Sequence, residues 1–192
     1  MNYDFTTVRD GLAQGSFKWN GMKANMPDVP SGIVPLSVAD MEFVLAPEIR
    51  EGICEALETT VIGYNGATDG YFDAVAGWMK ETHDWTVPKE AIVPFQGVVP
   101  MIEQAIRAFT QTGDGVLILT PVYHPFRMMI EKTERRVVTS SLLEDEGAYR
   151  IDFRDLEEKA KDARVLLFCS PHNPVGRVWD KLNRGRGFGD RS

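Results

Sequence analysis

Few residues of this sequence are suited to binding metal ions or forming disulfides. The 192 residues include two cysteines and three histidines. Neither a C-x-x-C pair nor an H-x-x-x-H pair occurs, although such spacings are the usual signature of a zinc site. Cys54 falls within a helical pattern and Cys169 within a strand pattern, which predicts buried, reduced thiols. The sequence therefore predicts neither a metal centre nor a disulfide framework.

Long hydrophobic runs and an excess of basic residues are also missing. The apolar runs Gly115–Leu119 and Val165–Cys169 are far shorter than the roughly 20 apolar residues that cross a bilayer. The polar start Met1–Asp10 lacks the apolar core of a secretory signal. The net charge is −7 and no basic stripe is present, which argues against nucleic acid as the main partner. We therefore expect a cytoplasmic protein with no membrane or nucleic-acid partner.

What the sequence does contain, from residue 46 onward, is an alternation of helical and strand patterns. The segment Ala46–Val61 has Pro47 in its first turn and apolar residues at helical spacing, which predicts a helix. Asp69 is placed to cap a second helix. The further expected elements are strand Ala91–Phe95, helix Val99–Thr112, strand Gly115–Thr120, helix Pro125–Arg135, strand Arg136–Ser141, an extended piece Tyr149–Asp152, helix Leu156–Asp162 and strand Arg164–Ser170.

Continuous apolar strands that alternate with helices predict an α/β fold, with a mostly parallel sheet and helices on both faces. Ligands of such sheets bind at the carboxyl ends of the strands. Three loops of unusual composition are expected at that edge, namely Gln96–Pro100, Pro121–Pro125 and Pro171–Gly176.

The two ends of the chain lack this alternation. Residues Met1–Val34 mix aromatics, glycines and prolines without a sustained period, so we expect an irregular arm that leads into an extended segment at Ile33–Val38. Residues 1–45 would then form the N-terminal arm and the start of the fold. Residues 180–192 are rich in glycine and arginine and have no apolar period. A solvated natural terminus fits this tail, and so does a truncation or a shifted reading frame. The second interpretation is at least as strong, because a sheet that stops after Arg164–Ser170 would leave a hydrophobic edge open.

Each of the three loops offers one group that suits a ligand site. Gly97 joins a strand to a helix N-terminus, where free N–H groups favour a phosphate, although turn geometry alone also explains a glycine. Tyr123 follows a buried strand, and its ring is suited either to stacking on a flat heterocycle or to packing its own loop. Asn173 lies between prolines, which hold it in a rigid loop with its amide free to point into a pocket, but Asn-Pro is also a common turn.

Taken together, five segments resemble the large-domain motifs of class I/II aminotransferase-like, fold type I pyridoxal-phosphate enzymes. They are Ser37–Phe43, Gly63–Tyr64, Gly97–Val99, Thr120–Pro125 and Ser170–Gly176. Within that superfamily, the segments Phe17–Trp19, Ala39–Phe43 and Cys169–Trp179 most resemble the cystathionine β-lyase subgroup called MalY/PatB. The resemblance extends to about Trp179. It implies that residues 46–179 form part of the large, cofactor-binding domain.

The resemblance implies a site for pyridoxal 5'-phosphate that is assembled from both subunits of a homodimer. Gly97, Val98 and Val99 would offer backbone donors to the cofactor phosphate. Tyr64 would reach across to the phosphate that the partner subunit binds. These roles come from the resemblance, and no spacing in the sequence establishes them.

The same resemblance implies contacts to the cofactor ring and to the substrate. Tyr123 would stack on the pyridine ring, and Asn173 would form a hydrogen bond with the phenolic oxygen of the ring. Ala39 and Asp40 would border the carboxylate of an amino-acid substrate. For Asp40, a role as a loop or cap residue is an equally good interpretation.

The implied activity is a carbon–sulfur β-lyase, which eliminates a thiol from cystathionine or another cysteine S-conjugate and leaves pyruvate and ammonia. The family places its Schiff-base lysine after the Asn-Pro motif, and we find no counterpart in this chain. The lysines present, Lys18 among them, are better explained as solvated surface charges. We therefore expect the chain alone to be inactive. An aminotransferase is the nearest alternative, and a non-catalytic remnant or cofactor-binding module is the alternative of another class.

Overall fold

The computed structural model describes residues 3–9 and 11–179, which fall into two compact units divided after Gly66. The first unit contains a 3-10 helix at Leu12–Gln14 and the helices α1 (Phe17–Asn25) and α2 (Pro47–Thr59). The second contains α3 (Asp69–His83), a 3-10 helix at Lys89–Ala91, α4 (Val98–Phe109), β1 (Gly115–Thr120), α5 (Pro125–Lys132), β2 (Arg136–Ser141), β3 (Leu143–Asp145), β4 (Ala148–Arg150), α6 (Phe153–Ala160) and β5 (Val165–Leu167). The expected tail lies outside the described residues, and the division into arm, large domain and tail stays a prediction.

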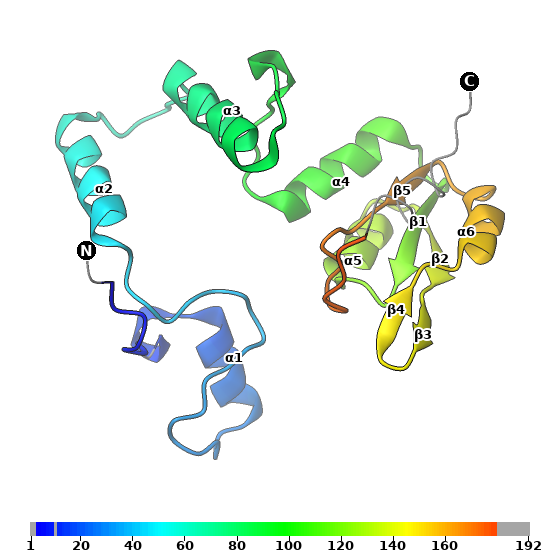
Figure 1. Ribbon diagram of the computed structural model, residues 1–192, viewed down its shortest axis with the longest axis horizontal. Helices are drawn as coiled ribbons and strands as arrows, with labels where there is room; N and C mark the ends of the chain where they lie inside the picture. Colours follow the sequence, from blue (N-terminus) through cyan, green and yellow to red (C-terminus); the bar gives the residue numbers. More distant parts are fainter. Residues whose placement is uncertain (1–2, 10, 180–192) are drawn as a thin grey trace. The chain divides into compact units, whose positions relative to one another are not determined.

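A parallel sheet of strand order β2-β1-β5 organises the second unit (Figure 1). In the β1–β2 register Gly115 lies opposite Arg136, and in the β1–β5 register Val116 lies opposite Val165. Strands β1 and β2 have the expected bounds, and the expected parallel α/β fold is confirmed. Strand β5 is shorter than the expected Arg164–Ser170, since its ladder with β1 covers only Val165–Leu167. Beyond it, the Cys169 carbonyl accepts a hydrogen bond from the Trp179 indole.

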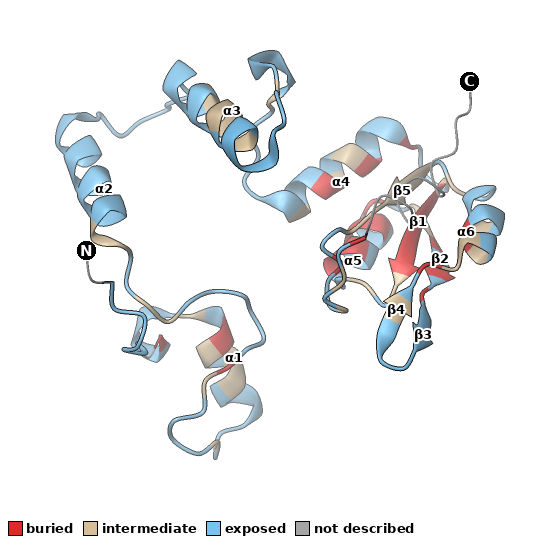
Figure 2. Ribbon diagram, viewed as in Figure 1, coloured by how far each residue is buried: buried red, intermediate tan, exposed pale blue. Residues whose placement is uncertain are grey.

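Strand β1 is buried on both faces, as its unbroken apolar sequence requires (Figure 2). Because side chains alternate along a strand, Val116 and Ile118 pack in one cluster with residues of α4 and α5. Leu117 and Leu119 pack on the other face, in a cluster that includes Leu156 of α6. Helices therefore cover both faces, and burying each of these side chains contributes about 1.5–3 kcal/mol.

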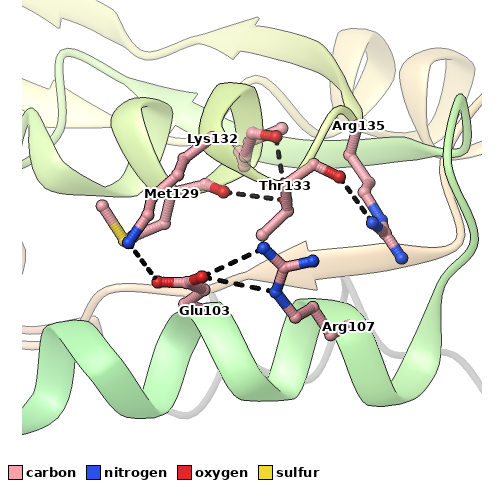
Figure 3. A network of polar contacts seen from close by, with 7 residues as sticks. Glu103, Arg107, Met129, Lys132, Thr133 and Arg135 are labelled. Carbon is pink, nitrogen blue, oxygen red and sulfur yellow. Dashed lines mark hydrogen bonds and ion pairs between the residues drawn. The ribbon is translucent and has the colours of Figure 1, made fainter.

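A charged network holds α4 against α5 (Figure 3). Lys132 Nζ donates to Glu103 Oε2 at 2.8 Å, and Arg107 Nη2 donates to Glu103 Oε1 at 3.1 Å. Arg135 Nη2 donates to the Thr110 carbonyl at 2.7 Å, just beyond the end of α4. The hydrogen bond from Lys132, and then that from Arg107, lower the pKa of Glu103 from its ordinary value.

Glu103→Gln is expected to destabilise the chain at pH 7 and to lose this effect on acidification. A carboxyl whose folded-state pKa is lowered stabilises the fold above its unfolded pKa of about 4.3, and this contribution disappears as the pH falls through the folded value. Urea unfolding of both proteins at pH 7, 5 and 3.5 measures the difference. Glu131→Gln, which removes an exposed partner of Arg127, is the control, and we expect a smaller effect there. A stability difference that does not change with pH would contradict the assignment.

The expectation of a wholly irregular arm is wrong, because α1 forms within it. The apolar residues of this helix do not recur at helical spacing, so the pattern gave no signal. Lys18 of α1 is buried, with 3% of its surface exposed, and is ion-paired to Asp40 and Glu42. The expected solvated charge at Lys18 is therefore also wrong. Tertiary ion pairing, not local periodicity, stabilises this helix.

Two further expectations in the second unit need correction. Residues 91–95 form no strand, since Ala91 N donates to the Pro88 carbonyl and Ile92 N to the Lys89 carbonyl, closing a 3-10 turn in place of a ladder. The cap of α3 is Thr68, whose hydroxyl accepts from Tyr71 N at 3.3 Å. Asp69 is instead the first residue of that helix. The other helices end within about one turn of their expected bounds.

The two cysteines differ from the expected buried pair. Cys54 is exposed on α2, so its expected burial is wrong, whereas Cys169 is half-buried and both thiols are free. Burial of Cys54 was inferred from the helical pattern of its segment, but residues on every side of α2 are exposed within this unit. Among the described residues, no helix combines the length and the apolar character needed to span a membrane.

Candidate functional site

The loops that follow β1 and β5 meet at the carboxyl edge of the sheet. His172, in the loop after β5, places its Nε2 atom 2.9 Å from the carbonyl oxygen of Pro121, in the loop after β1. The structure therefore brings together the two loops that carry Tyr123 and Asn173. The peptide bonds that precede Pro121 and Pro171 are cis.

Tyr123 lies at the surface of this edge. Its ring packs edge-on against Phe126, with ring centroids 6.4 Å apart, and 38% of the residue stays exposed. The backbone of this loop is fixed because Phe126 N donates to the Tyr123 carbonyl at 3.0 Å. Tyr123 thus offers aromatic surface to a ligand from a constrained backbone.

Asn173 is exposed, and its backbone is fixed more firmly than its side chain. Its N–H donates to the Cys169 sulfur at 3.5 Å. Gly176, at a φ of 67°, donates its N–H to the His172 carbonyl at 2.8 Å and closes the turn. Within the described part of the chain the side-chain amide of Asn173 makes no hydrogen bond. The two N–H donors of this amide and its carbonyl oxygen are therefore available to a ligand.

Gly97 caps α4 with a φ of 111°, a conformation that side-chain-bearing residues rarely adopt. A Cβ built at Gly97 would meet no heavy atom closer than Pro100 Cδ at 4.0 Å, so backbone conformation and not space favours glycine here. No side chain caps the helix, which leaves the N–H groups of its first turn available to an anion.

The first turn of α4 is tied to the same side of the sheet as the two loops. Val99, Val122 and Cys169 all pack against one buried cluster, which includes Ile106 and Ile118. Val98 is exposed. The three loops selected from the sequence therefore carry side chains that share one core cluster, with Gly97, Tyr123 and Asn173 exposed around it.

Asp40 belongs to the first unit, where it is held by α1. Lys18 Nζ donates to the Asp40 carbonyl at 2.5 Å, lies 3.2 Å from Asp40 Oδ1 and contacts the Glu42 carboxylate. The hydrogen bond with Glu42 is the main cause that raises the pKa of Lys18, and Asp40 adds to it against the opposing effect of burial. These residues and Trp19 line a cavity of about 210 Å³.

The remaining predicted residues, Ala39 and Tyr64, are exposed in the first unit. Their roles stay predictions. Sequence reasoning missed two residues that organise the candidate segments, namely Lys18 and His172. Both are buried polar side chains whose partners lie far along the chain, so no local pattern could have identified them. The only available signal was the position of His172 inside the proline-flanked Asn motif.

Comparison with known proteins matches residues 32–182 to the family model described as aminotransferase class I and II. Cystathionine beta-lyase PatB of Bacillus subtilis is 42% identical over 185 residues, which cover 94% of this chain and 46% of that protein. The chain spans about half the length of the curated relatives it matches.

Comparison with solved structures also finds similar proteins that contain pyridoxal phosphate. Cystalysin from Treponema denticola, which contains a pyridoxal 5'-phosphate cofactor, superposes with a TM-score of 0.91 at 49% identity, over 95% of this chain and 47% of that one. The pyridoxal-phosphate-bound C–S lyase from Staphylococcus hominis superposes with a TM-score of 0.84 at 29% identity, over 95% of this chain and 46% of that one. The likeness to the MalY/PatB subgroup expected from the motifs is confirmed.

Proposed function

Because the chain belongs to the aminotransferase class I and II family, we propose that the protein is a pyridoxal-phosphate-dependent carbon–sulfur β-lyase. The observation that carries the proposal is the meeting of the Tyr123 and Asn173 loops at the carboxyl edge of the sheet, through the contact between His172 and Pro121. The names of the relatives, a cystathionine beta-lyase and a C–S lyase, support the reaction class. An amino-acid substrate, a homodimer and a cytoplasmic location belong to the same proposal.

The residues present fit the cofactor. The uncapped first turn of α4, behind Gly97 and including the N–H groups of Val98 and Val99, suits a phosphate dianion. The exposed ring of Tyr123 suits stacking on a pyridine ring, and the unpaired amide of Asn173 suits a phenolic oxygen. A phosphorylated heteroaromatic ring requires three kinds of group: N–H donors for its phosphate, an aromatic surface for its ring and an amide for its ring substituent.

In this proposal the chain binds and orients, and the cofactor supplies an electron sink for negative charge that develops at the substrate α-carbon. The N-terminus of α4 would hold the cofactor phosphate, and Tyr123 and Asn173 would orient its ring. Ala39 and Asp40 would border the substrate carboxylate, with the Asp40 carbonyl oriented by Lys18. Tyr64 would contact the phosphate in the partner subunit. That the chain lacks the catalytic lysine and is inactive alone stays a prediction.

The cofactor assignment is tested by titrating pyridoxal 5'-phosphate into the chain and following protein fluorescence. We expect saturable binding, and we expect Asn173→Ala to weaken it about tenfold, because one hydrogen bond to an anionic oxygen is lost. Gln104→Ala removes an exposed amide on α4 and serves as the matched control with unchanged affinity. Absence of saturable binding, or equal losses in both variants, would contradict the assignment.

In the whole protein, product analysis separates elimination from transamination. A β-lyase is expected to release pyruvate and ammonia from cystathionine without an added 2-oxo acid. An aminotransferase would consume such an acid and release no thiol. The second result would retain the cofactor assignment and overturn the reaction class.

A further inference from the structure

His172 is the side chain through which the two ligand-facing loops touch. Only 1% of its surface is exposed, and its Nε2 atom lies 2.9 Å from the Pro121 carbonyl oxygen. Because a carbonyl oxygen can only accept, Nε2 must carry the proton of this hydrogen bond. His172 directly precedes Asn173, and Pro121 lies two residues before Tyr123. One hydrogen bond therefore links the side chain next to Asn173 to the backbone of the loop that carries Tyr123.

The surroundings of His172 hold the imidazole in one orientation. Its ring meets the buried Trp179 edge-on, with centroids 5.4 Å apart and planes at 82°. The backbone N–H of His172 donates to the Arg177 carbonyl at 2.7 Å, and the His172 backbone carbonyl accepts from the Gly176 N–H at 2.8 Å. Ring and backbone are thus both fixed, and the hydrogen bond to Pro121 keeps a defined direction.

Stability alone does not explain a histidine at this position. The second ring nitrogen, Nδ1, is buried and has no hydrogen-bond partner in the described part of the chain. A buried polar atom without a partner costs about 1–3 kcal/mol, which offsets most of what the hydrogen bond to Pro121 contributes. An apolar ring would fill the same space without this cost, but it would leave the Pro121 carbonyl without the donor that links the two loops. What histidine adds is a directed link between two loops.

We infer that His172 is a positioning residue that sets the separation of the Tyr123 and Asn173 loops, and with it the gap that receives the cofactor ring. This inference rests on the proposed function for the identity of the ligand. The link itself rests only on the contact with Pro121. His172 is expected to touch neither the cofactor nor the substrate, since it is buried beneath the loops it joins.

Two substitutions separate the hydrogen bond from the ring. His172→Gln keeps an N–H donor at a similar reach, whereas His172→Phe keeps an aromatic ring against Trp179 and leaves the Pro121 carbonyl unpaired. Native-state hydrogen exchange of residues 120–126 and 168–178, urea unfolding and pyridoxal 5'-phosphate titration are measured for both variants of the 192-residue chain. We expect His172→Phe to speed exchange in both loops by roughly tenfold while β1 and β2 change little. We expect His172→Gln to restore most of the protection.

Affinity for the cofactor is expected to change in parallel with hydrogen exchange in the two loops. It should fall about tenfold in His172→Phe and recover in His172→Gln. If the unmodified chain binds the cofactor and His172→Phe alters neither loop exchange nor affinity, the positioning role is overturned and the proposed function stands. If no protein binds the cofactor but loop exchange follows the expected order, the cofactor assignment fails and the link stands. A uniform rise of exchange across the whole sheet in both variants would show a merely structural role and overturn the inference.

Discussion

Replacing Gly115 with alanine is expected to destabilise the second unit by about 3 kcal/mol, because the added methyl group has no room. Its Cβ would lie 2.0 Å from the carbonyl oxygen of Asp162 and 3.0 Å from a methyl group of Val138 in β2. The Asp162 oxygen belongs to the backbone, so it cannot move aside as the end of a flexible side chain could. The Gly115 carbonyl also accepts a hydrogen bond from Arg164 N at 2.8 Å, immediately before β5. Any shift that relieves the clash therefore pulls β5 away from the central strand.

Gly77→Ala is the matched control for this experiment. A Cβ at Gly77 would meet no heavy atom within 4 Å, and the residue lies inside α3. Alanine is a better helix former than glycine by about 1 kcal/mol, so this variant is expected to match or exceed the parent in stability. Urea unfolding followed by circular dichroism compares the two. Equal stability of both variants would show that Asp162 and the start of β5 can move freely.

The sheet was predictable from the sequence because its signal is local. Gly115–Thr120 and Arg136–Ser141 are short runs rich in β-branched and apolar residues, and each begins after a turn that the sequence marks with glycine or charge. By contrast, α1 depends on the ion pairs of Lys18 with residues more than 20 positions along the chain. Segment 91–95 has a strand-like composition but finds no neighbouring strand in the described structure, and composition alone cannot report this.

The candidate site was predictable to the level of its loops but not of the contact that joins them. Gly97, Tyr123 and Asn173 were selected because parallel strands place their carboxyl ends at one edge. The structure confirms that the loops after β1 and β5 meet. The hydrogen bond that joins them spans 51 residues. Residue spacing in the sequence carries no information about such a pair, so the sequence indicates no role for His172.

Trp179→Ala is expected to destabilise the second unit by about 3–5 kcal/mol, the usual cost of removing a buried tryptophan. Trp179 is fully buried in the cluster that contains Leu117 and Leu119, on the α6 face of the sheet. Its indole also donates to the Cys169 carbonyl at 2.9 Å. The loop that carries Asn173 leaves the sheet after Leu167 and returns to the core at Trp179. This side chain therefore anchors the far end of the loop.

Two further variants divide this effect into its causes. Trp78→Ala removes a tryptophan that is 64% exposed on α3 and is expected to cost less than about 1 kcal/mol, since surface substitutions seldom cost more. Trp179→Phe keeps most of the packing but leaves the Cys169 carbonyl unpaired, so it is expected to lie between Trp179→Ala and the parent protein. Urea unfolding ranks the four proteins. If Trp179→Ala costs no more than Trp78→Ala, the Asn173 loop is not anchored through the core. Its geometry would then depend on the contact of His172 with Pro121 alone, and His172→Phe would have to release the loop completely.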